Sequence, residues 1–373
     1  MNKRQIFLSI CLFIVFFSLL SVASASHTTE NVTVTAVSDD SNAISVTDNQ
    51  DYNLGASPGS FSNLNKTIFD SQAGGSIPLE IDFTYSSEDG NFSEGILIDK
   101  SISIDGHGCT INAQNNASIF NIQGNSKVVL KNITFTNAVG VNGRAIKLGS
   151  SAQLEIINCN FIKNPHSLLG GAIYVSDSSS LTSNLNITDS TFNGNSARLG
   201  GAIYWTGDYG YLIDSKFTHN FASQDGGAIY WEGHNGFISG STFEYNNVSG
   251  LKNSNKSETR YNNDTGIDEI RYDILGGDGG AILWKGSDAI IENSTFNKNY
   301  ASYRGGAIFF IGMEGENCTN ITIENTNFTE NCAALNGGAL NWASGSSNAA
   351  IIGSNFSKNI AKRSAGAIYI SGN

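Results

Sequence analysis

The chain has 373 residues and a mass of 39.7 kDa, with 21 basic and 33 acidic residues and a net charge of −12 at pH 7. Only 14% of its residues are charged, and it contains 41 Gly, 45 Asn and 47 Ser but 3 Pro, which favours turn-rich β-structure over helical or coiled-coil folds. The acidic charge argues against a nucleic-acid partner, because phosphate binding needs basic side chains. The 40% of hydrophobic residues exclude a wholly disordered chain.

The N-terminus has the pattern of a secretory signal peptide. Two basic residues precede an apolar run over residues 6–20, and Ala23-Ser24-Ala25 resembles a cleavage site. We therefore expect residues 1–25 to be a signal peptide and the mature protein to be secreted or displayed at the cell surface. No other segment is expected to span a membrane, and the alternative is an uncleaved N-terminal anchor. Residues 26–60 are expected to form a flexible leader.

Residues 61–95 are expected to cap the N-terminal end of the fold. Phe61, Leu64 and Ile68 recur at helical spacing, which predicts a short amphipathic helix ahead of the first strands at 77–85 and 96–111. Such a helix would cover strand edges that otherwise invite pairing with another chain.

Cysteine and histidine spacing predicts neither a disulfide scaffold nor a metal site, and no cofactor is expected. Disulfide scaffolds are small and dense in Cys, whereas the Cys beyond the signal peptide are only Cys109, Cys159, Cys318 and Cys332. The five His have no ligand spacing.

An internal repeat fills the rest of the chain. Gly-Gly-Ala-Ile or a close variant recurs with its Ala at Ala145, Ala172, Ala202, Ala228, Ala281, Ala307, Ala339 and Ala367. Phe-x-x-Asn recurs with its Phe at Phe161, Phe192, Phe217, Phe243, Phe296, Phe328 and Phe356. Phe243 is followed by about 27 extra residues before the next glycine pair, and we expect segment 247–275 to be an inserted loop, although one degenerate coil would have the same length.

Alignment on the Phe residues shows the role of each column of the repeat. The residue five positions before Phe is always aliphatic. The residue three positions before Phe is always Asn, Asp or Gly, which tolerate the positive φ of a corner. The residue three positions after Phe is always Asn, which predicts a ladder of stacked amides at a second corner. The ladder residues are Asn164, Asn195, Asn220, Asn246, Asn299, Asn331 and Asn359.

Two further columns follow the glycine pair. All four Trp lie two residues after the Ile of the motif, and strand alternation places them inside if the Ile is inside. The column between the Ile and Trp columns would then face outward and form an aromatic ladder able to bind a partner. The opposite orientation, with the Trp column outside, stays open. Its aromatic members are Tyr174, Tyr204, Tyr230, Phe309 and Tyr369.

A period of 26 to 32 residues with two corners and strand alternation predicts an all-β parallel β-helix, a solenoid of about nine to ten rungs over residues 96–373. The combination of Gly-Gly-Ala-Ile and Phe-x-x-Asn resembles the repeat of chlamydial polymorphic outer membrane proteins. Segments 98–111, 119–122 and 129–137 are similar to the opening of adhesin-like surface proteins of methanogenic archaea. Both resemblances imply a right-handed, pectin-lyase-like β-helix, secretion, and an adhesive or surface-display role.

We therefore expect a non-enzymatic, adhesin-like protein that binds an extracellular glycan or surface protein. One alternative is a polysaccharide lyase or glycoside hydrolase on the same fold, which needs clustered carboxylates. The best pairs are Glu292 with Glu324 and Asp225 with Asp278, and we expect no basic residue to converge on either. Acids of the insertion could lie over the second pair. Another alternative is a structural spacer of the cell envelope.

The insertion also holds three Asn-x-Ser/Thr sequons, at Asn247, Asn255 and Asn263. Sequons in a secreted protein are acceptors for N-linked glycans. N-glycosylation of these three residues is therefore a hypothesis.

Overall fold

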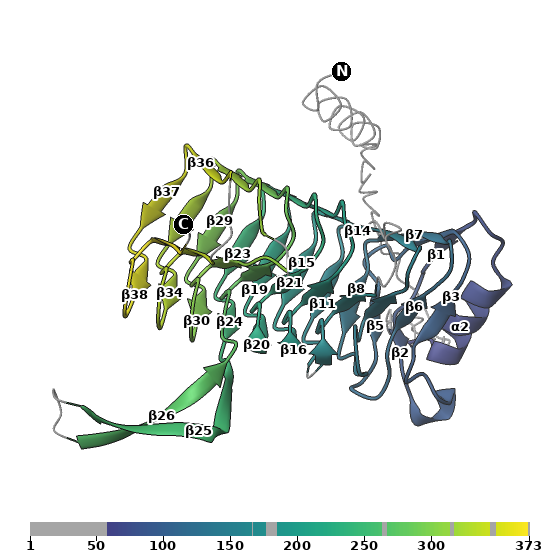
Figure 1. The fold of residues 1–373 in the computed structure, drawn as a ribbon. Helices are drawn as coiled ribbons and strands as arrows, with labels where there is room; N and C mark the ends of the chain where they lie inside the picture. Colours follow the sequence, from purple (N-terminus) through teal and green to yellow (C-terminus); the bar gives the residue numbers. More distant parts are fainter. Residues whose placement is uncertain are drawn as a thin grey trace, which may run out of the picture. The chain divides into compact units, whose positions relative to one another are not determined.

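The computed structural model describes residues 58–165, 167–176, 185–262, 267–313, 317–343 and 348–371, without the side chains of 252–275. These residues form an all-β parallel solenoid of about nine turns with one short α-helix (Figure 1), which confirms the predicted fold. The expected signal peptide, and the leader apart from 58–60, lie outside the described residues.

Each turn of the solenoid adds one strand to each of several parallel sheets, so neighbouring strands in a sheet are one turn apart in sequence. The Ile sheet consists of β1 (Ser76–Pro78), β4 (Ile102–Asp105), β7 (Lys127–Lys131), β10 (Gln153–Ile157), β14 (Leu185–Thr188), β18 (Tyr211–Ile213), β22 (Phe237–Ser239), β28 (Ile290–Glu292), β32 (Thr322–Glu324) and β36 (Ala350–Ile352). The Phe sheet consists of β2 (Phe83–Thr84), β5 (Thr110–Asn112), β8 (Thr134–Thr136), β11 (Asn160–Ile162), β15 (Thr191–Asn193), β19 (Lys216–Thr218), β23 (Thr242–Glu244), β29 (Thr295–Asn297), β33 (Asn327–Thr329) and β37 (Asn355–Ser357).

Two more sheets complete the turn. The short sheet consists of β12 (Ser167–Leu169), β16 (Ser196–Leu199), β20 (Phe221–Asp225), β24 (Asn247–Val248), β30 (Tyr300–Ala301), β34 (Cys332–Ala333) and β38 (Ile360–Ala361). The Trp sheet consists of β3 (Ile96–Ile98), β6 (Phe120–Ile122), β9 (Ile146–Leu148), β13 (Ile173–Val175), β17 (Ile203–Trp205), β21 (Ile229–Trp231), β27 (Ile282–Trp284), β31 (Ile308–Phe310), β35 (Leu340–Trp342) and β39 (Ile368–Ile370).

The corner between the Ile and Phe sheets is made by the column three residues before each Phe. Every member has a positive φ, between 47° and 59°: Asn158, Asp189, Asp214, Gly240, Asn293, Asn325 and Gly353. Asn, Asp and Gly adopt this left-handed conformation more readily than other residues. The sequence pattern therefore places this corner correctly in all seven repeats.

The core is built from ladders of identical side chains in register. Phe192, Phe217 and Phe243 stack face to face with ring centroids 4.5 and 4.9 Å apart. Trp205, Trp231 and Trp284 stack at 4.1 and 4.3 Å, and all four Trp are buried. The Trp column therefore faces the interior, as alternation from the buried Ile of the motif predicts.

The N-terminal helix α2 (Phe61–Asp70) has the expected amphipathic character. Ser60 caps it by accepting a hydrogen bond from the Asn63 N–H, and Phe61, Leu64 and Ile68 are buried. The 3₁₀ helix η1 (Ser87–Asp89) follows β2. Strands β1 and β2 already pair with β4 and β5, so the solenoid begins at Ser76 and not at residue 96. These first strands lack the repeat motif, which is why the sequence pattern predicts too late a start for the solenoid.

The insertion after Phe243 forms a hairpin and is neither a plain loop nor a coil of the solenoid. Asn247 and Val248 belong to the short sheet, where Asn247 pairs with Phe221 and Tyr300. The chain then forms the antiparallel strands β25 (Leu251–Asn262) and β26 (Ile267–Leu275), drawn leaving the coil beside β24 in Figure 1. The solenoid resumes at the following glycine pair.

Candidate functional site

The Asn column forms a continuous hydrogen-bonded ladder inside the corner after the Phe sheet. Each amide Nδ2 donates to the Oδ1 of the Asn one turn ahead at 2.9 to 3.0 Å. The Oδ1 also accepts the backbone N–H of the preceding Asn, and Nδ2 donates to a Phe-sheet carbonyl, as Asn299 does to Phe243. The five amides between Asn164 and Asn359 have both lone pairs and both protons engaged, so the role of the ladder is structural.

The Tyr column lies on the outer side of the Trp sheet, but much of it is covered. Tyr230 and Phe309 are only 6% and 1% exposed, and they pack together with Leu283 in a small external cluster. Tyr174, Tyr204 and Tyr369 are partly exposed. The expectation of a continuous exposed aromatic stripe is therefore wrong at Tyr230 and Phe309, because residues flanking the Trp sheet, such as Leu199 and Ile311, pack over them.

The rings of this column also cover one another. Tyr204 lies between Tyr174 and Tyr230, with centroids at 5.7 and 5.0 Å. The Lys285 ammonium lies 4.9 Å from the Tyr230 ring and 3.1 Å from a Glu232 oxygen, and the Tyr204 hydroxyl donates to Glu232. Burial raises the pKa of Tyr204. A sugar ring that stacks on an aromatic face would find these faces occupied.

The buried Asp225 and Asp278 form a column with the partly exposed Arg304, each one turn from the next. Arg304 donates from Nε to Asp278 Oδ1 at 3.0 Å and from Nη2 to Oδ2 at 2.7 Å. Asp278 in turn donates its backbone N–H to Asp225 Oδ1 at 3.1 Å. Burial, and then repulsion by Asp278, raise the pKa of Asp225 to about 6.

The expectation that no basic residue converges on this pair is thus wrong. Arg304 immediately precedes its glycine pair, as Asp225 and Asp278 precede theirs, so the repeat places all three in one column. Two parallel hydrogen bonds hold the positive guanidinium of Arg304 against the carboxylate of Asp278 and balance its negative charge. This arrangement anchors the chain where the hairpin returns to the solenoid.

The other acidic pair, Glu292 and Glu324, lies in register on adjacent strands of the Ile sheet. Glu292 accepts hydrogen bonds from Ser239 and Asn293. Among the described residues, no basic side chain forms an ion pair with either glutamate. Acidic side chains of the insertion, and the sequons Asn255 and Asn263, lie outside the described side chains, whereas Asn247 is exposed on β24.

An exposed group of rings, which the repeat pattern did not single out, surrounds the Asn corner. The residues two and four positions after each Phe point outward on either side of the inward Asn. Over three adjacent turns they bring together His219, Phe221, Tyr245 and Tyr300, which we name the corner patch. Tyr245 is 44% exposed, and Phe221 and Tyr300 are each 37% exposed. His219 and Tyr245, two residues after their Phe, have a positive φ, and Phe221 and Tyr300 lie at the start of short-sheet strands with their side chains exposed.

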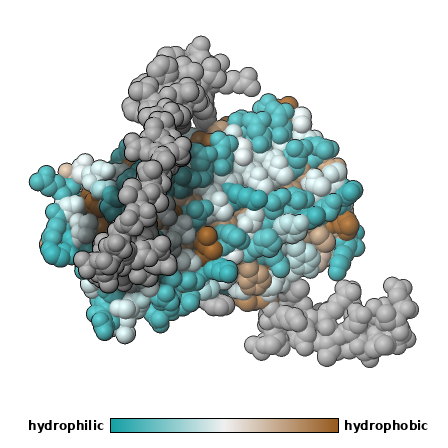
Figure 2. All heavy atoms as spheres, turned by 180° about the vertical axis from the view of Figure 1, so that it is seen from behind, coloured by the Kyte–Doolittle hydropathy of each residue, from teal (hydrophilic) through white to brown (hydrophobic). Residues whose placement is uncertain are grey.

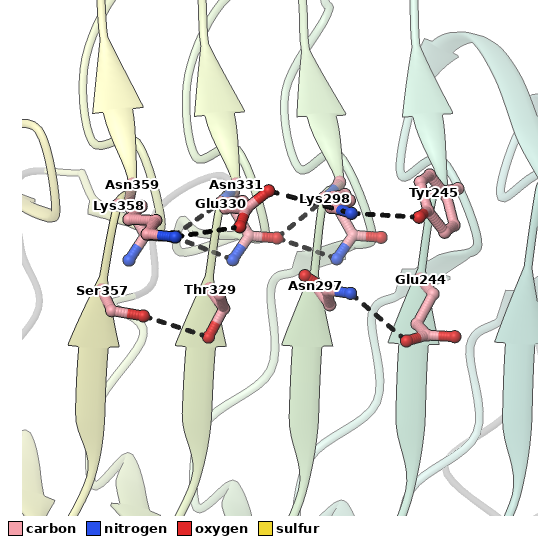
Figure 3. Close-up of polar contacts among 11 residues, drawn as sticks. Glu244, Tyr245, Asn297, Lys298, Thr329, Glu330, Asn331, Ser357, Lys358 and Asn359 are labelled. Carbon is pink, nitrogen blue, oxygen red and sulfur yellow. Dashed lines mark hydrogen bonds and ion pairs between the residues drawn. The ribbon is translucent and has the colours of Figure 1, made fainter.

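Charged residues continue the corner patch along the same column. His219 stacks on Tyr245 at 5.1 Å, and the Lys298 ammonium lies 3.2 Å from the Tyr245 hydroxyl. Glu330 then forms ion pairs with Lys298 at 3.8 Å and with Lys358 at 3.7 Å (Figure 3). On the face of the solenoid seen in Figure 2, hydrophobic residues lie scattered among hydrophilic ones and form no stripe.

In the comparisons with known proteins, the match found covers part of the repeat. A family model of the Chlamydia polymorphic membrane protein repeat matches residues 189–204, 214–230 and 293–311. Each matched segment runs from the corner before the Phe sheet to the outer face of the Trp sheet. This repeat is typical of surface or autotransporter proteins. No curated protein and no solved structure matches the chain, and nothing in these comparisons supports the expected likeness to archaeal adhesins.

Two further observations concern the described part of the chain. It contains no group of three or more His, Cys, Asp or Glu side chains that could hold a metal ion, and no helix long and apolar enough to cross a membrane. Cys109, Cys159, Cys318 and Cys332 are free thiols. Burial raises the pKa of Cys159 and of Cys318 to about 12, which keeps both as unreactive thiols.

Proposed function

We propose that this chain is a secreted or surface-displayed, adhesin-like protein that binds a protein partner through the corner patch. The observation that carries the proposal is the set of four outward-facing rings on three adjacent turns, bordered by Lys298 and Glu330. Exposed Tyr and Phe beside charged residues are typical of protein interfaces. The match to a repeat typical of surface proteins supports the location.

A protein partner is favoured over a glycan by the way the rings are oriented. Tyr245 has His219 on one side and the Lys298 ammonium 5.4 Å from its ring centroid. A stacked sugar needs a free ring face, whereas a protein side chain can pack against ring edges and hydroxyl groups. The alternating charges of Lys298, Glu330 and Lys358 would fix the register of such a partner.

A non-enzymatic role is supported by what the buried carboxylates do. Asp278 is neutralised by Arg304, and Asp225 accepts a backbone hydrogen bond from Asp278. Both side chains are buried, so a polysaccharide would have to displace the base of the hairpin to reach them. The alternative of a polysaccharide-cleaving enzyme predicts product release from polysaccharide substrates, and a depolymerisation assay run beside the binding assay distinguishes the two.

The test replaces two rings of the corner patch and measures adherence of the purified, labelled chain to a panel of cells. In Tyr245→Asn, the new residue suits the positive φ of 53°, and in Tyr300→Thr it suits a strand. We expect the double variant to bind at least tenfold more weakly, because central exposed aromatic residues carry much of an interface's affinity. Protease treatment of the cells should abolish binding of the unmodified chain, and glycosidase treatment should not.

The matched control is Tyr209→Asn. Tyr209 is 46% exposed and also has a positive φ, of 54°, but it lies in the turn between β17 and β18. This variant should adhere like the unmodified chain. Equal adherence of all three chains would contradict the proposal, and loss of binding after glycosidase treatment would instead assign a glycan partner.

A further inference from the structure

Arg144 departs from the repeat at a position that is otherwise glycine. It stands just before Ala145, where later turns have Gly171, Gly201, Gly227, Gly280, Gly306 and Gly338. At each of those glycines a Cβ would lie 2.0 to 2.2 Å from a carbonyl oxygen of the next turn. The chain before Arg144 joins the short sheet by a single bridge, from Asn142 to Leu169. Since this turn is not held at the close approach that needs glycine, it accommodates a long side chain.

The Arg144 side chain is buried, and no described residue is its partner. The residue is only 8% exposed, and its Nε is fully buried and makes no hydrogen bond. Within the described part of the chain, no carboxylate or other side chain pairs with its guanidinium. Burial lowers the pKa of Arg144 to about 10, so the group stays charged at neutral pH. A buried charge without a partner is destabilising, because its desolvation is not offset by an opposite charge.

We infer that Arg144 is the centre of a binding site for an oxyanion, the carboxylate or sulfate group of a ligand. The planar fork of a guanidinium matches the two oxygens of such a group with two parallel hydrogen bonds. Burial raises the strength of this contact, because little water competes for the donors. The ligand supplies the negative charge that the described residues do not.

The surroundings of Arg144 suit an anion carried on a sugar. A Cβ at Gly143 would lie 2.4 Å from the Cβ of Tyr174, so this segment lies directly against the Tyr column. The stack of Tyr174, Tyr204 and Tyr230 ends at Tyr174, and the next residue in register is Lys147. Lys147 lies 3.3 Å from a Glu94 oxygen and is partly exposed. The last ring of the stack and two cations thus lie in one region of the chain.

The experiment measures thermal unfolding of the purified full chain in sodium chloride, sodium sulfate and sodium glucuronate at equal ionic strength. We expect sulfate and glucuronate to raise the Tm by several degrees, with a rise that saturates at high anion concentration, because a ligand that binds only the folded state stabilises it. Arg144→Met should remove the saturable part. Sulfate also stabilises proteins through exclusion from their surface. The matched control is therefore Arg198→Met, which removes an exposed Arg whose Nε donates to Gln224 and should keep the full response.

Calorimetric titration of the unmodified chain with glucuronate keeps the test independent of whether Arg144→Met folds. A saturable heat that sulfate competes away supports the site. Tighter binding of an acidic oligosaccharide than of sulfate assigns a sugar-borne anion, and equal binding of these two ligands assigns a free anion. The inference is overturned by a titration without saturable heat, or by the same Tm response in Arg144→Met and Arg198→Met. Tyr245→Asn, which tests the proposed function, should leave this response unchanged.

Discussion

At the scale of single residues, one position of the repeat holds side chains of different charge in adjacent turns. The position before the glycine pair is Leu199, Asp225, Asp278 and Arg304 in successive turns. Because side chains of a column lie one strand spacing apart, about 4.8 Å, the three charged ones are forced into contact. Arg304 pairs with Asp278, and Asp225 is left as a buried acid without a cation of its own in that column.

Asp225 makes stability depend on pH. Its pKa in the folded protein is about 6, against an ordinary value of 3.8, so the folded state binds the proton more tightly than the unfolded state. Stability should therefore fall as pH rises through the window from about 4 to 6, by roughly 3 kcal/mol in total. In Asp225→Asn this dependence should disappear and the Tm at pH 7.5 should rise, as thermal unfolding across pH would show. Asp99→Asn, at an exposed position, serves as control. Parallel Tm curves for Asp225→Asn and the unmodified chain would contradict the assignment.

At the scale of elements, the hairpin is an addition to a turn that is complete without it. The chain leaves the solenoid after Val248-Ser249 and returns at Asp278-Gly279-Gly280, whereas the preceding turn passes directly from Ala222 to Asp225 and its glycines. Gly276 and Gly277 have positive φ, and the Gly277 N–H donates to the Gln224 carbonyl. The hairpin is thus held at its base by the backbone of the turn below.

Replacing residues 250–277 by a single Gln should therefore preserve the solenoid. The new sequence Val-Ser-Gln-Asp-Gly-Gly would match Ala222-Ser-Gln-Asp-Gly-Gly of the preceding turn. Loop length affects stability weakly, about 0.6 kcal/mol per doubling, so we expect the free energy of unfolding to change by no more than about 3 kcal/mol. Circular dichroism and urea unfolding measure this. Loss of the cooperative transition would mean that β25 and β26 are needed for folding.

At the scale of the whole solenoid, stability is propagated from turn to turn. Each described turn between the ends is hydrogen-bonded to the turn before and the turn after it, and such proteins behave as one-dimensional arrays of coupled units. The Asn ladder runs through seven turns without a break. Its amides therefore couple segments that are far apart in sequence.

Asn299→Ala tests this coupling. The change leaves the Phe243 carbonyl and two donors of Asn246 without partners in a buried corner, and each unmet group costs about 1–3 kcal/mol. We expect a loss of roughly 3–5 kcal/mol, with faster amide hydrogen exchange in the turns containing Asn246 and Asn331. Asn297→Ala, in the same turn of the solenoid but only half-buried, should change stability by less than about 1 kcal/mol, because its side chain reaches no buried partner of the ladder. Exchange that is faster only at the mutated turn would contradict the coupling.

The sequence alone determined the solenoid, its corners and its inward columns. These depend on strand alternation and on residues that tolerate positive φ, both of which are local properties repeated in every turn. Only the tertiary structure decided which outward side chains reach solvent. Tyr230 and Phe309 are covered by neighbouring residues, Tyr245 and Tyr300 are not, and Arg144 is buried without a partner among the described residues. The exposure and the pairing of a side chain depend on residues that other turns bring next to it, and the sequence of a single repeat does not contain those residues.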